Sequence, residues 1–207
     1  KEEKLLLMSK ESQNSSDILT AIKQIVNNCS VDPKFDVNKL ALFDLEYIFL
    51  KLRALSVDNI VKLSYRDTED QKVYEFEINL DEVEVKIPAK LDNNIKITNK
   101  SGIIMKYPSA TLYDDNEFLN LDKDYMFELI IRCIESIYYE DQIYNCSDYK
   151  REELNEFLED LNIKTFENIQ NFLLSVPRME YKIEYENSLG NKREIVLSSL
   201  NDFFTWR

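Results

Sequence analysis

The sequence predicts an α+β protein with N-terminal helices, an antiparallel β meander, a second helical layer, and a C-terminal β hairpin with a short terminal helix. The prediction depends on where the period of apolar residues changes along the chain. Hydrophobic residues make up 44% of the 207-residue chain, which is typical of a folded protein. We therefore expect a single compact domain over residues 1–207, with four possible subdivisions: 1–57, 58–108, 109–177 and 178–207.

Helical spacing governs the N-terminal part. "KEEKLLLM" opens a helix expected over residues 1–13, and Ser15 and Ser16 are suited to cap a second one. In a third helix, Asp44 is the expected N-cap. The second and third helices each show an apolar face at helical spacing: Ile18, Ile22, Ile25, Val26 and Cys29; then Leu45, Ile48, Phe49, Leu52 and Leu55, widened by Tyr47 and Leu50.

The period changes to two in the next fifty residues. Strict alternation leaves each strand one wet face, which predicts an antiparallel meander covered on its other face by helices. "GIIMKYP" ends this meander. Gly102 is expected to form a turn with positive φ, and Pro108 ends the last strand. The alternating segments are 61–65, 74–80, 83–87 and the shorter 95–97.

Helical spacing returns after Pro108 and continues to Pro177. A final hairpin is expected to turn at Gly190, before a short helix in "SSLNDFF". "VKLSYRD" and "YKIEYEN" share one pattern 120 residues apart, which is typical either of two hairpins of one design or of any two amphipathic strands. The helical stripes are Met126, Ile130, Cys133, Ile134 and Ile137; Leu154, Phe157, Leu158 and Leu161; Phe166, Ile169 and Leu173.

Composition excludes several kinds of active site. The chain has no histidine, and therefore no Ser-His-Asp triad, no Cys-His dyad and no histidine-containing metal site. Its two glycines, Gly102 and Gly190, are too far apart for a phosphate-binding loop. Three widely spaced cysteines form no metal-binding pair, so no catalytic, metal or cofactor site is expected. Cys29 and Cys133 lie on apolar faces, which predicts buried free thiols in a reducing cytoplasm.

The net charge of −13 argues against nucleic acid as a direct ligand, because phosphate binding needs clustered Lys and Arg. The acidity favours solubility, an acidic face for a basic partner, or a mimic of DNA. No apolar run approaches the roughly 18–20 residues of a membrane span, so we expect a soluble protein. Because the chain opens on Lys1 without a methionine, we also expect residues upstream.

Two apolar groups are the best candidates for contact with a partner. The first ends the meander and is apolar on both strand faces, so another chain or the protein's own helices must cover one of them. The second closes the sequence, and either folds back as a lid over the hairpin or anchors a partner. The candidate interface residues are Ile103, Met105 and Tyr107, and Phe203, Phe204 and Trp206.

Four segments, in matching order over nearly the whole chain, resemble the baseplate hub subunit and hub-assembly proteins of T-even-like, contractile-tailed bacteriophages. They are "KEEKLLLM", "DVNKLALFDLEYIFLKLRALSV", "GIIMKYP" and "SSLNDFF". The resemblance implies a structural or assembly role in the tail baseplate, without catalysis. Some members carry cysteine pairs near positions 66–72 and 186–191; this chain has none there, so no zinc site is carried over.

The leading interpretation is therefore a non-enzymatic component of a phage baseplate hub, or a factor that assembles the hub in the host cytoplasm. Its expected partners are other hub or tail proteins, with no nucleic acid and no direct membrane insertion. An acidic, DNA-mimicking inhibitor of a host nucleic-acid enzyme is the alternative, although here the acids alternate with lysines along the strands. A hydrolase that uses a pair of carboxylates is the third hypothesis.

Overall fold

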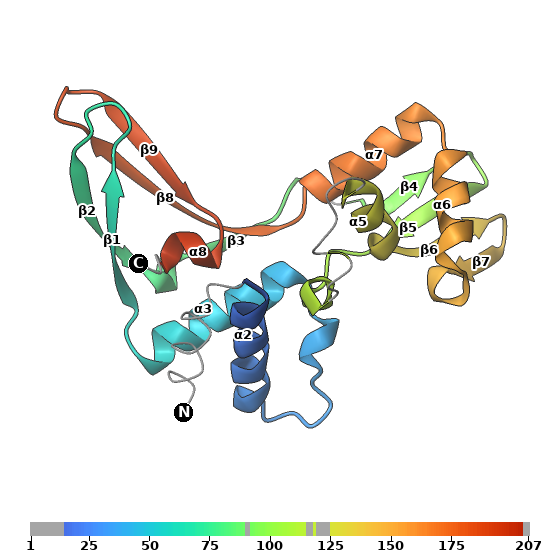
Figure 1. Cartoon of the computed structure of the whole chain (residues 1–207), viewed down its shortest axis with the longest axis horizontal. Helices are drawn as coiled ribbons and strands as arrows, with labels where there is room; N and C mark the ends of the chain where they lie inside the picture. The colour runs from blue at the N-terminus through green and yellow to red at the C-terminus, as the bar shows by residue number, and fades with distance from the viewer. Residues whose placement is uncertain (1–14, 90–91, 115–117, 119–124, 205–207) are drawn as a thin grey trace. The chain divides into compact units, whose positions relative to one another are not determined.

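Two units make up the part of the chain that the computed structural model describes, which is residues 15–89, 92–114, 118 and 125–204. The first combines Lys1–Lys86 with Pro177–Arg207, and the second is Ile87–Val176 (Figure 1). The helix expected over 1–13 lies outside the described residues. The predicted α+β class is confirmed, with N-terminal helices, antiparallel sheets, further helices, and C-terminal strands with a short terminal helix. The single domain stays a prediction.

Helices α2 (Ser15–Cys29) and α3 (Leu42–Ser56) open the first unit and pack on each other, next to a 3-10 turn, η1 (Val37–Lys39). Phe49 is deeply buried in α3, as its stripe predicts. The predicted cap was wrong, because Ala41 takes the N-cap position and Asp44 lies in the first turn. Leu55 is 83% exposed instead of buried. It follows Leu45 by ten residues, which puts it about 80° away around the helix axis, off the covered face.

The strands of the first unit form two antiparallel sheets. β1 (Ile60–Arg66) pairs with β2 (Val73–Asn79) in a hairpin, and the 3-10 turn η2 (Leu80–Glu82) follows it. The second sheet has the order β3-β8-β9. β8 (Arg178–Glu186) and β9 (Lys192–Leu197) form the predicted C-terminal hairpin, which turns at Gly190 with φ of 80°. The short helix α8 (Leu200–Phe203) follows, as expected.

The expected single meander was wrong. β3 (Glu84–Lys86) does not continue the β1-β2 hairpin but pairs with β8, ninety-odd residues later in the chain. β4 (Asn94–Lys96) and β5 (Ser101–Met105) belong to the second unit, in a sheet of order β4-β5-β6-β7. Alternation identifies the apolar face of each strand but does not identify its neighbour, because the side-chain period is the same in every antiparallel pairing.

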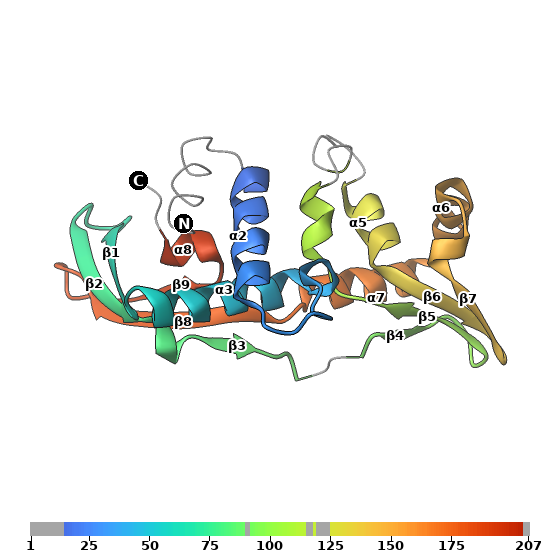
Figure 2. The ribbon, with the colours of Figure 1, turned by 90° about the horizontal axis from the view of Figure 1, so that it is seen from below.

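Three helices among the described residues of the second unit pack on its sheet: α5 (Tyr125–Cys133), α6 (Arg151–Glu159) and α7 (Ile163–Leu174). The core combines residues from the sheet and all three helices, including Ile103, Ile130, Leu158 and Ile169. Ile130 is 0% exposed, as predicted. Figure 2 gives a second view of these elements. The described residues of the unit also include two 3-10 turns, η3 (Ala110–Asp114) and η4 (Cys146–Asp148).

The helix expected to run through Ile137 was wrong, because α5 ends at Cys133 and strand β6 (Ile134–Tyr139) begins at the next residue. β6 pairs with β5 on one side and with β7 (Gln142–Asn145) on the other, so its backbone groups have strand partners. Its residues are largely β-branched or aromatic, which favours a pleated surface. Ile134 and Ile137 therefore keep the helical spacing of the stripe only by coincidence, because they belong to the strand that follows the helix.

Gly102 lies within β5 and is buried, so the predicted turn at this position was wrong. Tyr138 stands directly opposite on β6, and its hydroxyl donates to the side-chain oxygen of Asn94 at 2.9 Å. A Cβ on Gly102 would lie 2.5 Å from the Tyr138 hydroxyl oxygen and 2.8 Å from the carbonyl oxygen of Ile95. Glycine is required here by the close approach of a side chain and a backbone, and not by its φ angle.

We expect Gly102→Ala to destabilise the protein by about 1–3 kcal/mol, the usual cost of overpacking a well-filled site. Urea unfolding followed by circular dichroism measures this loss. Tyr138→Leu removes the ring that the new methyl group meets, so Gly102→Ala should cost less in a Tyr138→Leu background. Equal costs in the two backgrounds would show that the contact with Tyr138 does not determine the choice of glycine.

Candidate functional site

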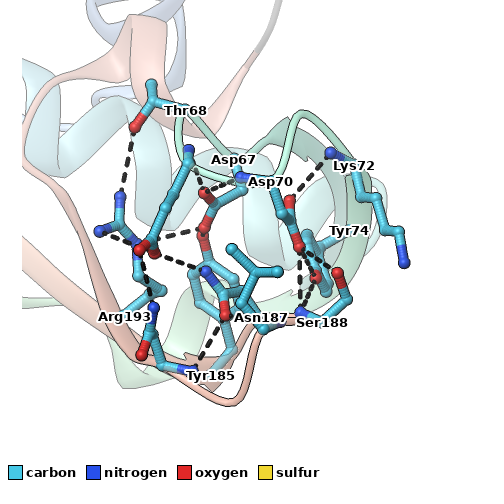
Figure 3. A network of polar contacts seen from close by, with 12 residues as sticks. Asp67, Thr68, Asp70, Lys72, Tyr74, Tyr185, Asn187, Ser188 and Arg193 are labelled. Carbon is cyan, nitrogen blue, oxygen red and sulfur yellow. Dashed lines mark hydrogen bonds and ion pairs between the residues drawn. The ribbon is translucent and has the colours of Figure 1, made fainter.

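The most densely bonded polar site in the described residues is where the tips of the two hairpins of the first unit meet (Figure 3). The loop after β1 and the loop after β8 have similar internal bonds. The Asp67 N–H donates to the Lys72 carbonyl at 2.9 Å, and the Asn187 N–H donates to the Asn191 carbonyl at 3.0 Å. In each loop the first side chain also accepts the N–H two residues later, an Asx-type turn. We call this contact the hairpin clasp.

The repeated pattern in the sequence identified these two hairpins but not their contact. Tyr65 and Tyr185, the tyrosines of the two matching segments, lie edge to face with ring centroids 6.4 Å apart. Tyr185 also packs on Tyr74 at 5.0 Å and on Phe76 at 5.2 Å. The aromatic face of one hairpin therefore covers that of the other, below the polar tips.

The hairpin clasp is built around Asp67, whose side chain is fully buried. One carboxylate oxygen accepts the Glu69 N–H at 2.6 Å. The other accepts the Tyr185 hydroxyl at 2.5 Å and the Arg193 Nε–H at 3.2 Å. The hydrogen bond from Tyr185, followed by the backbone N–H groups and the charge of Arg193, lowers the pKa of Asp67 despite its burial. Burial and this bond raise the pKa of Tyr185 to about 12.

A second carboxylate, Asp70, joins the same two loops. It accepts the Tyr74 hydroxyl at 2.6 Å, and the N–H and hydroxyl of Ser188 at 3.0 and 2.8 Å. Burial alone would raise the pKa of Asp70, but the bonds from Tyr74, the Lys72 N–H and Ser188 outweigh it and lower the pKa. The first loop thus supplies acceptors, and the second hairpin supplies most of the donors that cross between them.

Glu69 completes the hairpin clasp on its exposed side. Its two carboxylate oxygens accept the side-chain amides of Asn187 and Asn191, each at 2.7 Å. Arg193 lies 3.7 Å from the same carboxylate and also donates to the Thr68 hydroxyl at 3.2 Å. All three acids of the first loop are therefore bonded to the second hairpin.

This arrangement is suited to holding two segments together and unsuited to proton transfer. The buried carboxylate stays ionised and each of its oxygens already accepts hydrogen bonds, so it is a poor general acid or base. Within the described residues, no group of three or more Cys, Asp or Glu side chains is arranged to hold a metal ion. None of the described helices is long and apolar enough to cross a membrane.

The second unit also contains a buried carboxylate, Glu128, which links two of its helices. Glu128 on α5 forms ion pairs with Arg132 and with Arg151 of α6, whose Nε–H donates to it at 3.0 Å. Burial would raise the pKa of Glu128, but the two guanidinium groups lower it. The ion pairs link α5 to α6, since leaving this charge unpaired in the interior would be costly.

The six predicted interface residues fall into different units. Ile103 and Met105 are buried in the core of the second unit, and Tyr107 is half-buried with its ring stacked on Phe172 at 5.3 Å. The face of β5 that needed cover is thus covered by the protein's own helices. Whether any of these residues also contacts a partner stays a prediction.

Near the C-terminal end of the sequence, Phe203 of α8 is fully buried. Phe204 lies edge-on to Phe49 of α3, with ring centroids 6.2 Å apart. Trp206 lies outside the described residues. Among the cysteines, Cys133 and Cys146 are buried free thiols, but Cys29 is exposed because it is the last residue of α2. Burial raises the pKa of Cys133 to about 12, which makes its thiol unreactive.

The fold and site define a protein without an evident catalytic centre in its described residues, whose polar groups mainly join its own segments. A family model described as T4 bacteriophage base plate protein matches residues 1–205. The chain belongs to this family of phage baseplate proteins. Comparisons with curated proteins and with solved structures found no match.

Removing the clasp's buried donor should loosen the two hairpins. We expect Tyr185→Phe to lower the melting temperature by several degrees, because the ring contacts remain while Asp67 loses the bond from the hydroxyl. Tyr181→Phe, on the same strand, is the matched control, since its hydroxyl does not contact Asp67 and bonds instead to Glu82 at 3.5 Å and to the backbone of Asn79. The difference should shrink only as the pH falls below 3.8, the ordinary pKa of Asp67, towards its lowered pKa in the folded state, because the carboxyl group is then protonated and the hydroxyl loses its charged acceptor. Equal melting of both variants would contradict this account.

A half-buried acid at the junction of α3 and α8 predicts an opposite pH dependence. Glu46 accepts the backbone N–H of Leu200 and lies near Asp202; burial is the main cause that raises its pKa from 4.5 to about 7. Between these values the folded state holds a proton that the unfolded chain releases. This contribution to stability is therefore fully present below pH 4.5 and is lost as the pH rises to about 7.

We expect Glu46→Gln to raise the melting temperature at pH 8 and to leave it nearly unchanged at pH 5, since glutamine stays neutral and can still accept the N–H. Calorimetric melts across this range measure the effect. Glu75→Gln, at an exposed position of β2, is the control for the general effect of losing one negative charge. A shift at pH 8 that the control matches would contradict a specific role for Glu46.

Proposed function

We propose that the protein is a non-enzymatic component of the baseplate hub, or a factor that assembles the hub in the host cytoplasm, and that it acts through protein–protein contacts. The family match over residues 1–205 is the observation that carries this proposal. The hub is the finer assignment, and it depends on the order of the four sequence segments described above.

The chemistry of the described residues supports a role without catalysis. The two buried carboxylates, Asp67 and Glu128, are held ionised by donors from their own unit. A groove of about 600 Å³ among the described residues is lined by residues of β1, β2, β9 and α8, and its two acids, Glu194 and Asp202, are bonded to Lys182 and to Ser199. The described part of the chain therefore offers surfaces for assembly, and none of its described acids is arranged as a prepared site for a small substrate.

Among the predicted interface residues, Phe204 and Tyr107 are the most accessible candidates with described side chains, because both are only half-buried. The other three candidates with described side chains are buried, so they would contribute to an interface only through the packing of their own unit; they are Ile103, Met105 and Phe203. The proposed partners remain other hub or tail proteins.

The test is affinity purification of the tagged chain from phage-infected cells, with mass spectrometry of both the complex and purified virions. We expect other hub proteins in the complex; their presence with the chain in virions would identify a resident component, and its absence from virions an assembly factor. Recovery of a host nuclease or polymerase without tail proteins would contradict the proposal and favour an acidic inhibitor.

Phe204→Ala provides a paired measurement. We expect it to weaken co-purification with hub proteins by about 2 kcal/mol or more of binding energy, as truncated interface aromatics often do. Melting of the same variant reports the stability lost with the Phe49 contact, and Tyr107→Ala is the matched truncation in the second unit. If Phe204→Ala lowers stability but its folded fraction still assembles, this aromatic belongs to the core alone.

A further inference from the structure

An unpaired sheet edge lies on the second unit. In the sheet of order β4-β5-β6-β7, one edge strand, β4, lies against α7. The other, β7, has β6 as its only strand neighbour among the residues that the structure describes. Both views show β7 at the outer side of this sheet, beside α6 (Figures 1 and 2). An uncovered edge presents backbone donors and acceptors to any extended segment that approaches it.

The register identifies these backbone groups. A two-residue turn, Glu140–Asp141, joins β6 to β7, with Glu140 at a φ of 53°. The pair that closes the turn is Tyr139 and Gln142. Because bonded and non-bonded pairs alternate in an antiparallel ladder, Ile143 belongs to a non-bonded pair. The N–H and C=O of Ile143 and Asn145 therefore point away from β6.

The side chains of β7 do not guard this edge. Natural edge strands are commonly protected by a Lys, a Pro or an inward-pointing charge, and the sequence of β7, Gln-Ile-Tyr-Asn, contains none of these. Ile143 at its centre is 71% exposed, and neighbouring Tyr139 on β6 is 56% exposed. These two exposed side chains flank the available backbone groups, as they would in a strand-docking surface.

The charge around β7 specifies the kind of partner. Residues 135–160 contain nine acidic and two basic residues, and all nine acids are exposed; one of them, Glu140 at the β6-β7 turn, is paired with Lys100 at 2.7 Å. On α6 they recur at Glu152, Glu156 and Glu159, while the basic Arg151 is engaged in its ion pair with Glu128. A second copy of the chain would bring like charge against like charge at this edge. A basic segment would gain from it, because complementary charge steers association and suppresses wrong partners.

We infer that the free edge of β7 binds an extended, lysine- or arginine-rich segment of another protein by adding it as a fifth strand. The inference rests on the proposed function, in which the chain acts by contacts with other baseplate proteins. Backbone bonds at Ile143 and Asn145 supply the docking, the exposed Ile143 side chain supplies an apolar contact, and the acids of α6 select a basic sequence.

The experiment uses the full chain and a soluble peptide of about ten residues in which Lys and Val alternate. Binding is followed by NMR, with hydrogen exchange of the backbone amides. We expect shift changes and slowed exchange at Ile143 and Asn145. Ile143→Pro should weaken binding at least about tenfold, since it removes the outward N–H without removing a bond to β6. Ile143→Val, which keeps that N–H and the β-branched side chain, should bind within about twofold of the unchanged chain.

Two further arms separate strand pairing from simple attraction of charge. The same peptide with alternate backbone nitrogens methylated keeps its charge but loses donors, and it should bind poorly. Glu152→Gln with Glu156→Gln should weaken binding of the original peptide and reduce its salt dependence. Equal binding of the two peptides, or equal binding by Ile143→Pro, would overturn the inference.

If Ile143→Pro disturbs the β6-β7 ladder, Ile143→Lys decides instead, because it keeps the backbone N–H and adds the charge that protects natural edges. If Ile143→Lys binds the peptide as well as the unchanged chain does, the inference is overturned. It is also overturned if sedimentation shows that the unchanged chain forms a concentration-dependent dimer and that Ile143→Lys abolishes this dimer. The peptide contains no phage sequence, so its failure to bind leaves the hub proposal intact. If the chain does not co-purify with hub proteins, the hub proposal is overturned, but the inference that the β7 edge binds a basic strand is not affected.

Discussion

The buried carboxylate of Asp67 is the contact on which the arrangement of the first unit depends. A charge with no exposed surface must be surrounded by donors, and those available within its own loop are backbone N–H groups. The phenol of Tyr185 and the guanidinium of Arg193 complete its shell, and both come from the other hairpin. A two-stranded hairpin is marginal by itself in water, so the two hairpins stabilise each other by stacking aromatic faces and joining at their tips.

The second unit depends on close packing in its sheet and on one buried charge. Gly102 lets the ring of Tyr138 cross β5 and reach Asn94, which ties three neighbouring strands together. Glu128, between Arg132 and Arg151, links α5 and α6 over the apolar core. In both units, therefore, the distinctive polar residues are engaged in linking parts of the same unit.

This use of polar residues supports the functional proposal. Enzymes usually keep at least one group with a shifted pKa facing a cleft, where it can meet a substrate. Here the lowered carboxyl pKa values at Asp67, Asp70 and Glu128 are explained by hydrogen bonds and ion pairs within the protein, and the raised pKa of Glu46 is explained by its burial where α3 meets α8. In the part of the chain that the structure describes, what remains available to other molecules is surface. Around β7 that surface is acidic and carries backbone groups without a strand partner among the described residues. Such a surface suits an assembly protein of a phage baseplate.

The sequence by itself determined the α+β class, the stripe of α7 and that of α2 apart from Cys29, the final hairpin turning at Gly190, and the broader family of phage baseplate proteins. These follow from local periodicity, from turn residues and from the order of short segments along the chain. Tertiary structure alone decided that α5 stops at Cys133, that β3 joins β8, and that Gly102 lies in a strand. It also brought Asp67 to Tyr185, although the repeated Lys-apolar-polar-Tyr pattern marked both hairpins. The reason is that periodicity reports which face of an element is apolar, whereas strand partners and hydrogen-bond donors come from segments a hundred residues away.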